Sequence, residues 1–68
     1  MQNKIRELRQ SHGISQAKLG DMLNVSRQTI NSLESGRYNP SITLAFKLAN
    51  VFNMQIEDIF IYKEKEND

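Results

Sequence analysis

Apolar residues recur at spacings of three and four along most of the chain, which is the periodicity of amphipathic helices. A first helix is expected at residues 3–11, where Ile5 and Leu8 share one face, and Gly13 suits a left-handed stop after it. Three further helices each follow a serine that can accept a hydrogen bond from the first helical turn. These helices are expected at 16–23, 27–35 and 42–52, behind Ser15, Ser26 and Ser41.

The chain after the fourth helix is less regular. Glu57 and Asp58 suit the first turn of a short fifth helix ending near Phe60, because acidic side chains are favourable beside the positive end of the helix dipole. A short strand at 60–62 is also possible, whereas the segment before the first helix is too short to predict a β-hairpin there. Short connections between five helices predict an all-α domain. We expect it to cover residues 1–62 and to be followed by a charged tail at 63–68.

Residues 15–35 predict two short helices joined by a tight turn, which is the arrangement of a helix-turn-helix. Gly20 lies midway along the first of them, where close approach of the second helix requires a small side chain. Asn24 occupies the turn, where a positive φ is needed and asparagine tolerates it. The apolar positions of the first helix are Leu19, Met22 and Leu23. The residues expected to pack the pair onto the core are Leu19, Leu23, Val25, Ile30 and Leu33.

This segment resembles the Cro/C1-type, or XRE, family of helix-turn-helix regulators. The resemblance lies in Gln16-Ala17, Gly20, Asn24-Val25-Ser26, Ile30, Leu33-Glu34 and Gly36. Residues 26–31, 38–41 and 56–60 resemble the short single-domain bacterial members, such as the enterococcal cytolysin repressor. The resemblance covers about residues 3–62. It implies a compact, lambda-repressor-like domain of five helices that acts as a dimeric, sequence-specific DNA-binding transcription regulator.

The outer face of the expected third helix is polar, and its side chains are of the kinds that recognise bases. Arginine pairs with O6 and N7 of guanine and glutamine with N6 and N7 of adenine, each giving about 1–3 kcal/mol of discrimination. The second helix of such a motif enters the major groove with its first residues against the bases. Base contacts are expected from Arg27, Gln28, Asn31 and Ser32. The alternative interpretation is a polar face that is only solvated.

Contacts to the DNA backbone are expected on both sides of this helix. Gln16 begins the second helix, whose backbone N–H groups favour a phosphate, and the family resemblance supports this role. Ser26 caps the third helix and can also donate its hydroxyl to a phosphate, whereas packing on the fourth helix is the alternative for Tyr38. The complete expected set is Gln16, Ser26, Thr29, Arg37, Tyr38 and Asn39.

Two further groups have expected structural roles. The resemblance implies an ion pair between Arg9 and Glu34, which would join the first helix to the end of the third. A dimer interface is expected where apolar residues exceed what the core of the motif requires, although Phe46 and Ile56 could instead complete that core. The expected interface residues are Phe46, Met54, Ile56, Ile61 and Tyr62. A two-fold dimer would place two recognition helices about 34 Å apart on a near-palindromic site.

Size and charge narrow the classes of function. A chain of 68 residues makes one small domain of marginal stability, for which dimerisation is a common remedy. Residues 1–56 carry seven Lys and Arg against three Asp and Glu, whereas residues 57–68 carry two against five. The basic part is therefore expected to face a polyanion and the acidic end to face away from it. The absence of cysteine, of a signal peptide and of an apolar run near the roughly 20 residues of a membrane span favours a cytoplasmic protein.

An enzyme is not expected from this sequence. His12 is the single histidine, and neither a metal-site pattern nor a glycine-rich phosphate loop is present, so we expect no cofactor and no metal. The prediction is a homodimeric repressor of transcription that occludes a promoter on double-stranded DNA. The alternative is a module that binds a protein partner, such as an antitoxin or an adaptor, in which Arg27 and Gln28 would be dispensable.

Overall fold

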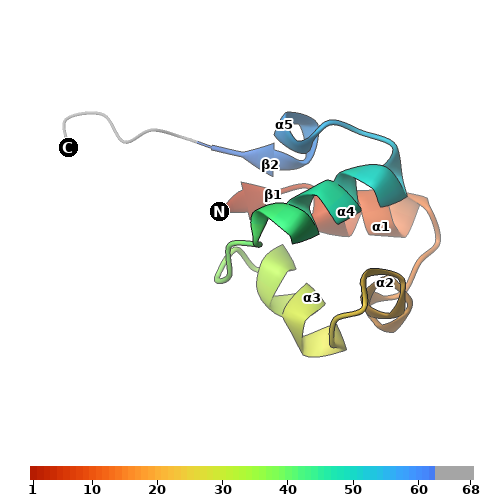
Figure 1. Ribbon diagram of the computed structural model, residues 1–68. Helices are drawn as coiled ribbons and strands as arrows, with labels where there is room; N and C mark the ends of the chain where they lie inside the picture. Colours follow the sequence, from red (N-terminus) through yellow and green to blue (C-terminus); the bar gives the residue numbers. More distant parts are fainter. Residues whose placement is uncertain (63–68) are drawn as a thin grey trace.

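The computed structural model describes residues 1–62, which form five helices and one two-stranded sheet (Figure 1). The helices are α1 (Ile5–Ser11), α2 (Gln16–Leu23), α3 (Arg27–Glu34), α4 (Ile42–Phe52) and α5 (Ile56–Ile59). The strands are β1 (Gln2–Asn3) and β2 (Phe60–Ile61). The predicted five-helix domain is confirmed, and the predicted tail at 63–68 lies outside the described residues.

The small sheet joins the two ends of the described chain. Its antiparallel register places Gln2 opposite Ile61 and Asn3 opposite Phe60. The possible strand near the C-terminus is thus present, and α5 stops just before it, at Ile59. The β1 strand was not predicted, and the first helix begins at Ile5 instead of residue 3, because the preceding residues pair with β2. The Lys4 N–H extends this pairing by donating to the Ile59 carbonyl at 2.8 Å.

The helix boundaries follow the predicted local signals. Each of three serine hydroxyls accepts a hydrogen bond from the backbone N–H three residues later, which satisfies a donor that the helix itself leaves free. The pairs are Ser15 with Lys18 at 3.0 Å, Ser26 with Thr29 at 3.1 Å and Ser41 with Leu44 at 3.1 Å. The left-handed positions predicted at Gly13 and Asn24 have φ values of 67° and 60°.

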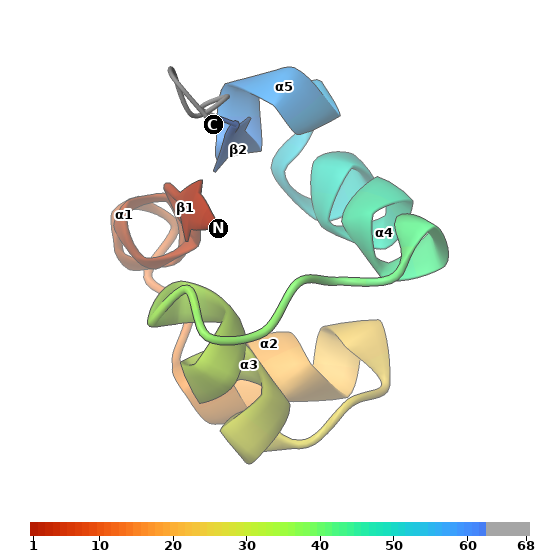
Figure 2. The same cartoon turned by 90° about the vertical axis from the view of Figure 1, so that its left-hand side faces the viewer.

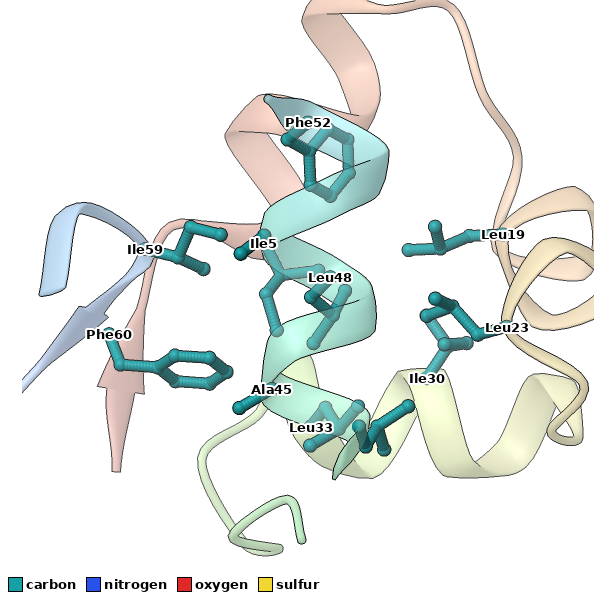
Figure 3. Packing of buried hydrophobic residues seen from close by; sticks show 12 residues of the cluster. Ile5, Leu19, Leu23, Ile30, Leu33, Ala45, Leu48, Phe52, Ile59 and Phe60 are labelled. Atoms are coloured by element: carbon teal, nitrogen blue, oxygen red, sulfur yellow. The ribbon is translucent and has the colours of Figure 1, made fainter. Parts of the chain in front are cut away.

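The elements surround one hydrophobic core. Figure 2 shows α1 and α4 on opposite sides of the molecule, with α5 and β2 at one end and the α2–α3 pair at the other. Buried side chains from every helix and from β2 meet between them (Figure 3). They are Ile5, Leu19, Leu23, Ile30, Leu33, Leu44, Ala45, Leu48, Ala49, Phe52, Ile59 and Phe60. Within residues 1–62, no helix combines the length and the apolar character required to cross a membrane.

Candidate nucleic-acid interface

The α2 and α3 helices cross at very short range. A Cβ atom at Gly20 would lie 2.7 Å from the backbone oxygen of Val25, which is closer than real contacts allow. The Val25 N–H also donates to the Gly20 carbonyl at 2.9 Å, directly after the left-handed residue Asn24. The backbone at Gly20 therefore fixes the position of α3 relative to α2, and even alanine at this position would require a backbone shift.

The outward face of α3 is polar and hollowed. Its inward residues Ile30 and Leu33 are fully buried, whereas Arg27, Gln28 and Asn31 are exposed. A groove of about 270 Å³ runs along the outward side. Its lining comprises Ser26, Gln28, Thr29, Ser32 and Tyr38, all of them residues predicted to contact DNA. The fold thus brings predicted base contacts and predicted backbone contacts to one surface.

A second hollow lies beside this groove, at the first turns of α2 and α3. Its lining comprises Arg9, Ser15, Gln16, Ala17 and Arg27. The Nε atom of Arg27 lies 3.5 Å from Oε1 of Gln16, so the residue predicted to contact a phosphate touches a residue predicted to contact a base. The Lys18 N–H is already satisfied by Ser15, but the N–H groups of Gln16 and Ala17 at the start of the helix have no partner within the helix. These groups suit an anion.

The loop after α3 is held close to the helix it follows. The N–H groups of Arg37 and Tyr38 both donate to the Ser32 carbonyl, at 3.2 and 3.3 Å. Tyr38 is exposed and lines the α3 groove, and the Arg37 side chain donates from Nε to the Ser35 hydroxyl at 3.0 Å. Asn39 accepts from the Met1 amino group at 3.3 Å. Arg37 and Tyr38 therefore lie next to α3, whereas Asn39 is held by the N-terminus.

A buried carboxylate connects α1, α2 and α3. The Glu34 side chain has no exposed surface, and its Oε2 accepts a hydrogen bond from Arg9 Nε at 2.7 Å. Its Oε1 accepts from Gln16 Nε2 at 3.1 Å and from Arg6 Nε at 3.3 Å. The Arg9 side chain, which is 12% exposed, also donates from Nη1 to the Ile14 carbonyl at 2.9 Å. The ion pair between Arg9 and Glu34 is thus one part of a larger network.

The roles of two residues in this network were not predicted from the sequence. Arg6 was not among the predicted site residues, although its spacing of three from Arg9 places both on one face of α1. Gln16 was assigned only to a phosphate, and its contact with Glu34 depends on how α2 and α3 cross. The spacing of Arg6 and Arg9 could have indicated the role of Arg6. No pattern in the sequence indicates that Gln16 contacts Glu34.

The network lowers the pKa of Glu34. Burial by itself raises the pKa of the carboxyl, but hydrogen bonds from Arg9, Gln16 and Arg6, together with the charge of Arg9, more than reverse that effect. The net pKa lies below the ordinary value of a glutamate side chain. Glu34 is therefore ionised in the folded protein under neutral conditions, as its contacts with two guanidinium groups require.

The lowered pKa of Glu34 predicts a loss of stability in acid. Because folding lowers the Glu34 pKa, the contribution of Glu34 is complete above the ordinary pKa of 4.5 and is lost as the pH falls through the folded-state value. Urea unfolding between about pH 6 and about pH 3 should show this decline. The free energy of unfolding of the Glu34→Gln variant should decline less steeply over the same pH range. Parallel curves for the two proteins would contradict the assignment.

The residues predicted to form a dimer interface lie on α4, in the connection from α4 to α5, on α5, on β2 and directly after β2. Phe46 is 56% exposed and Tyr62 is 75% exposed, and Ile61 is also exposed. Phe46 borders a shallow groove between α4 and α5 together with Met54 and Ile56. Met54 and Ile56 are only partly exposed, because they also pack against the core. Figure 1 shows α5 at the opposite end of the molecule from α2 and α3.

Comparison with known proteins agrees with this geometry. A family model described as helix-turn-helix matches residues 5–59. An HTH-type transcriptional regulator from Methanocaldococcus jannaschii is 50% identical over 66 residues, which is 97% of this chain and 100% of the relative. The HTH-type transcriptional regulator YgzD from Bacillus subtilis is 48% identical over 67 residues, covering 98% of this chain and 100% of the relative.

A solved structure supports the same assignment. The restriction-modification controller protein C.AhdI from Aeromonas hydrophila superposes with a TM-score of 0.75 at 30% sequence identity, covering 84% of this chain and 86% of that chain. The fold, the crossing of α2 and α3 and these likenesses lead to one conclusion. The chain belongs to the helix-turn-helix family of DNA-binding transcriptional regulators, of the XRE type.

Proposed function

We propose that this chain is a cytoplasmic repressor that binds a near-palindromic operator as a homodimer, with α3 in the major groove, and blocks transcription by occluding a promoter. It would be a short single-domain member of its family, of the kind represented by the enterococcal cytolysin repressor. The observation that carries the proposal is the outward face of α3. Arg27 and Gln28 are exposed at its first turn, while Ile30 and Leu33 hold the opposite face in the core.

The positions of the polar residues support a division of roles. Side chains in the first turns of α3 would approach base edges, because that end of a recognition helix enters the groove. The residues assigned to bases are Arg27, Gln28, Asn31 and Ser32. Residues on either side would contact phosphates and fix the orientation of α3. They are Gln16, Ser26, Thr29, Arg37, Tyr38 and Asn39.

Replacement of Gln28 by alanine tests the assignment to bases. We expect the variant to lose about 1–3 kcal/mol of discrimination at one base pair of each half-site and to keep its preferences elsewhere. Competition binding with duplexes that differ at single positions of a selected operator measures this. Gln10→Ala, which changes an exposed glutamine on α1 that is outside the set predicted to contact DNA, is the matched control. Equal weakening on every duplex would instead make Gln28 a phosphate contact.

The homodimer is supported by exposed and partly exposed apolar side chains on α4, α5 and β2 and next to them. Phe46, Met54 and Ile56 border a groove, and Ile61 and Tyr62 add exposed apolar surface. Burial of such a patch against a second copy would supply stability that a domain of this size lacks. The two-fold arrangement would present two α3 helices to successive turns of the same face of the duplex.

Replacement of Phe46 by serine tests the dimer. The variant should shift from dimer to monomer in sedimentation analysis, because a half-exposed aromatic ring at an interface contributes more than its small polar substitute. Its affinity for a two-half-site operator should fall at least about tenfold. Met22→Ser, which alters an exposed apolar residue on α2, should leave the oligomeric state unchanged. A monomeric parent protein at all concentrations would contradict the proposal.

Salt dependence separates this function from that of a protein-binding module. A protein that contacts several phosphates releases counterions, so its affinity for a duplex falls steeply as salt rises. We expect that dependence for the parent protein and a shallower slope for Arg37→Ala. A folded protein that binds no duplex at low salt would favour the alternative of an antitoxin or adaptor.

A further inference from the structure

The side-chain amide of Gln16 has only one favourable orientation. Its nearest polar neighbour is the buried carboxylate of Glu34, which is ionised and can only accept hydrogen bonds. The amide must therefore direct its nitrogen toward Glu34, and this Nε2 atom lies 3.1 Å from Oε1 of the carboxylate. The reverse orientation would place the amide oxygen against a buried negative charge.

The orientation of the amide determines what Gln16 presents on its other side. With the nitrogen directed to Glu34, the amide oxygen faces the first residue of α3 and lies 3.5 Å from Arg27 Nε. A guanidinium has only donors, so an oxygen is the one end of the amide that can hold it. The hydrogen bonds thus run from Arg27 to Gln16 and from Gln16 to Glu34, across three elements of the fold.

We infer that Glu34 is a positioning residue for Arg27, acting through the fixed orientation of Gln16. The buried ion pair with Arg9 keeps the carboxylate ionised and in place, and the carboxylate in turn keeps an acceptor beside Arg27. An arginine that is held before binding loses less side-chain freedom on binding, which favours both affinity and discrimination. That Arg27 contacts a base rests on the proposed function, whereas its restraint in the free protein does not.

The test follows the mobility of Arg27 in the free protein by NMR relaxation of its Nε–H group. Glu34→Gln should increase this mobility, because a neutral amide at position 34 lets Gln16 turn either way. The double variant Q16E/E34Q should restore the restraint, since the new amide at 34 can donate to a carboxylate at 16, which accepts from Arg27. Arg6→Ala is the control, because it removes another contact of Glu34 without touching Gln16.

Two results would overturn the inference. If Glu34→Gln lowers stability but leaves Arg27 mobility unchanged, or if the double variant fails to restore the restraint, Glu34 has only a structural role. Should Glu34→Gln not fold, Gln16→Ala takes its place, because it keeps the ion pair of Glu34 with Arg9 and removes the amide that connects Glu34 to Arg27. Unchanged Arg27 mobility in Gln16→Ala would overturn the inference equally.

Binding data distinguish this inference from the proposed function. On a selected operator, Glu34→Gln should reduce base discrimination about tenfold at the position that Arg27→Ala identifies, and Arg6→Ala should not. If the parent protein binds no DNA at all, the proposed function fails, while the mobility of Arg27 in the free variants still decides whether Glu34 positions it.

Discussion

Replacing Arg9 with alanine is expected to lower the free energy of unfolding by about 3 kcal/mol, a large part of the stability of a small domain. The loss arises because the Glu34 carboxylate, which has no exposed surface, would keep only Arg6 as a cationic partner, at 3.3 Å. The Ile14 carbonyl would also lose the donor that Arg9 provides at 2.9 Å. Urea denaturation followed by circular dichroism measures the effect.

Arg6→Ala is the matched control for this prediction. Arg6 contacts the same carboxylate but is 58% exposed, so its removal should cost less than about 1 kcal/mol. A difference between the two variants would show that burial, and not the number of ion pairs, determines the contribution. Equal losses in the two variants would contradict the account of Arg9 as the principal partner of Glu34.

Substitution of Gly20 by valine is expected to cost about 3 kcal/mol or more. The new Cβ atom would meet the Val25 backbone oxygen at 2.7 Å, and the two methyl groups would extend further into the crossing of α2 and α3. A backbone atom cannot rotate away as a side chain can, so α3 must move. Thermal and urea unfolding measure the loss, and binding to a selected operator should fall with it.

Ala17→Val provides the comparison on the same helix. This change adds two methyl groups, as Gly20→Val does beyond its new Cβ atom. Residue 17 is exposed, so the added groups meet no steric conflict and the change should cost less than about 1 kcal/mol. A similar small loss at Gly20 would mean that the crossing of α2 and α3 tolerates side chains. The close approach described here would then be wrong.

Signals that act within a few residues of the chain were sufficient to predict most of the fold. Ser15, Ser26 and Ser41 begin helices because their hydroxyls satisfy the free N–H groups of the first turn. Asn24 adopts the left-handed conformation that the turn requires. These requirements are local, so they can be predicted without knowledge of the tertiary structure.

Features that depend on distant parts of the chain were not predictable in this way. The β1 strand has two residues and no periodicity, and it forms only because β2 lies beside it. Met22 and Leu23 are neighbours on the apolar side of α2, but Leu23 is buried and Met22 is 46% exposed. Helical spacing alone does not reveal where the packed side of a helix ends.

The candidate site also combines features that local sequence signals predict with features that depend on distant parts of the chain. The polar face of α3 follows from the helical period once Ile30 and Leu33 are assigned to the core. The contact of Gln16 with Glu34 could not be predicted, because the two residues lie on different helices and meet only through the angle at which those helices cross. Such contacts are where a structure adds most to the interpretation of this family.

Selection of bound duplexes from a random DNA pool, with the purified protein at moderate salt, tests the central claim most directly. We expect enrichment of a two-fold symmetric motif whose half-sites lie about one helical turn apart, since a dimer presents two α3 helices at that spacing. Enrichment of a single half-site would contradict the dimer. No enrichment by folded protein would contradict sequence-specific recognition of DNA through α3.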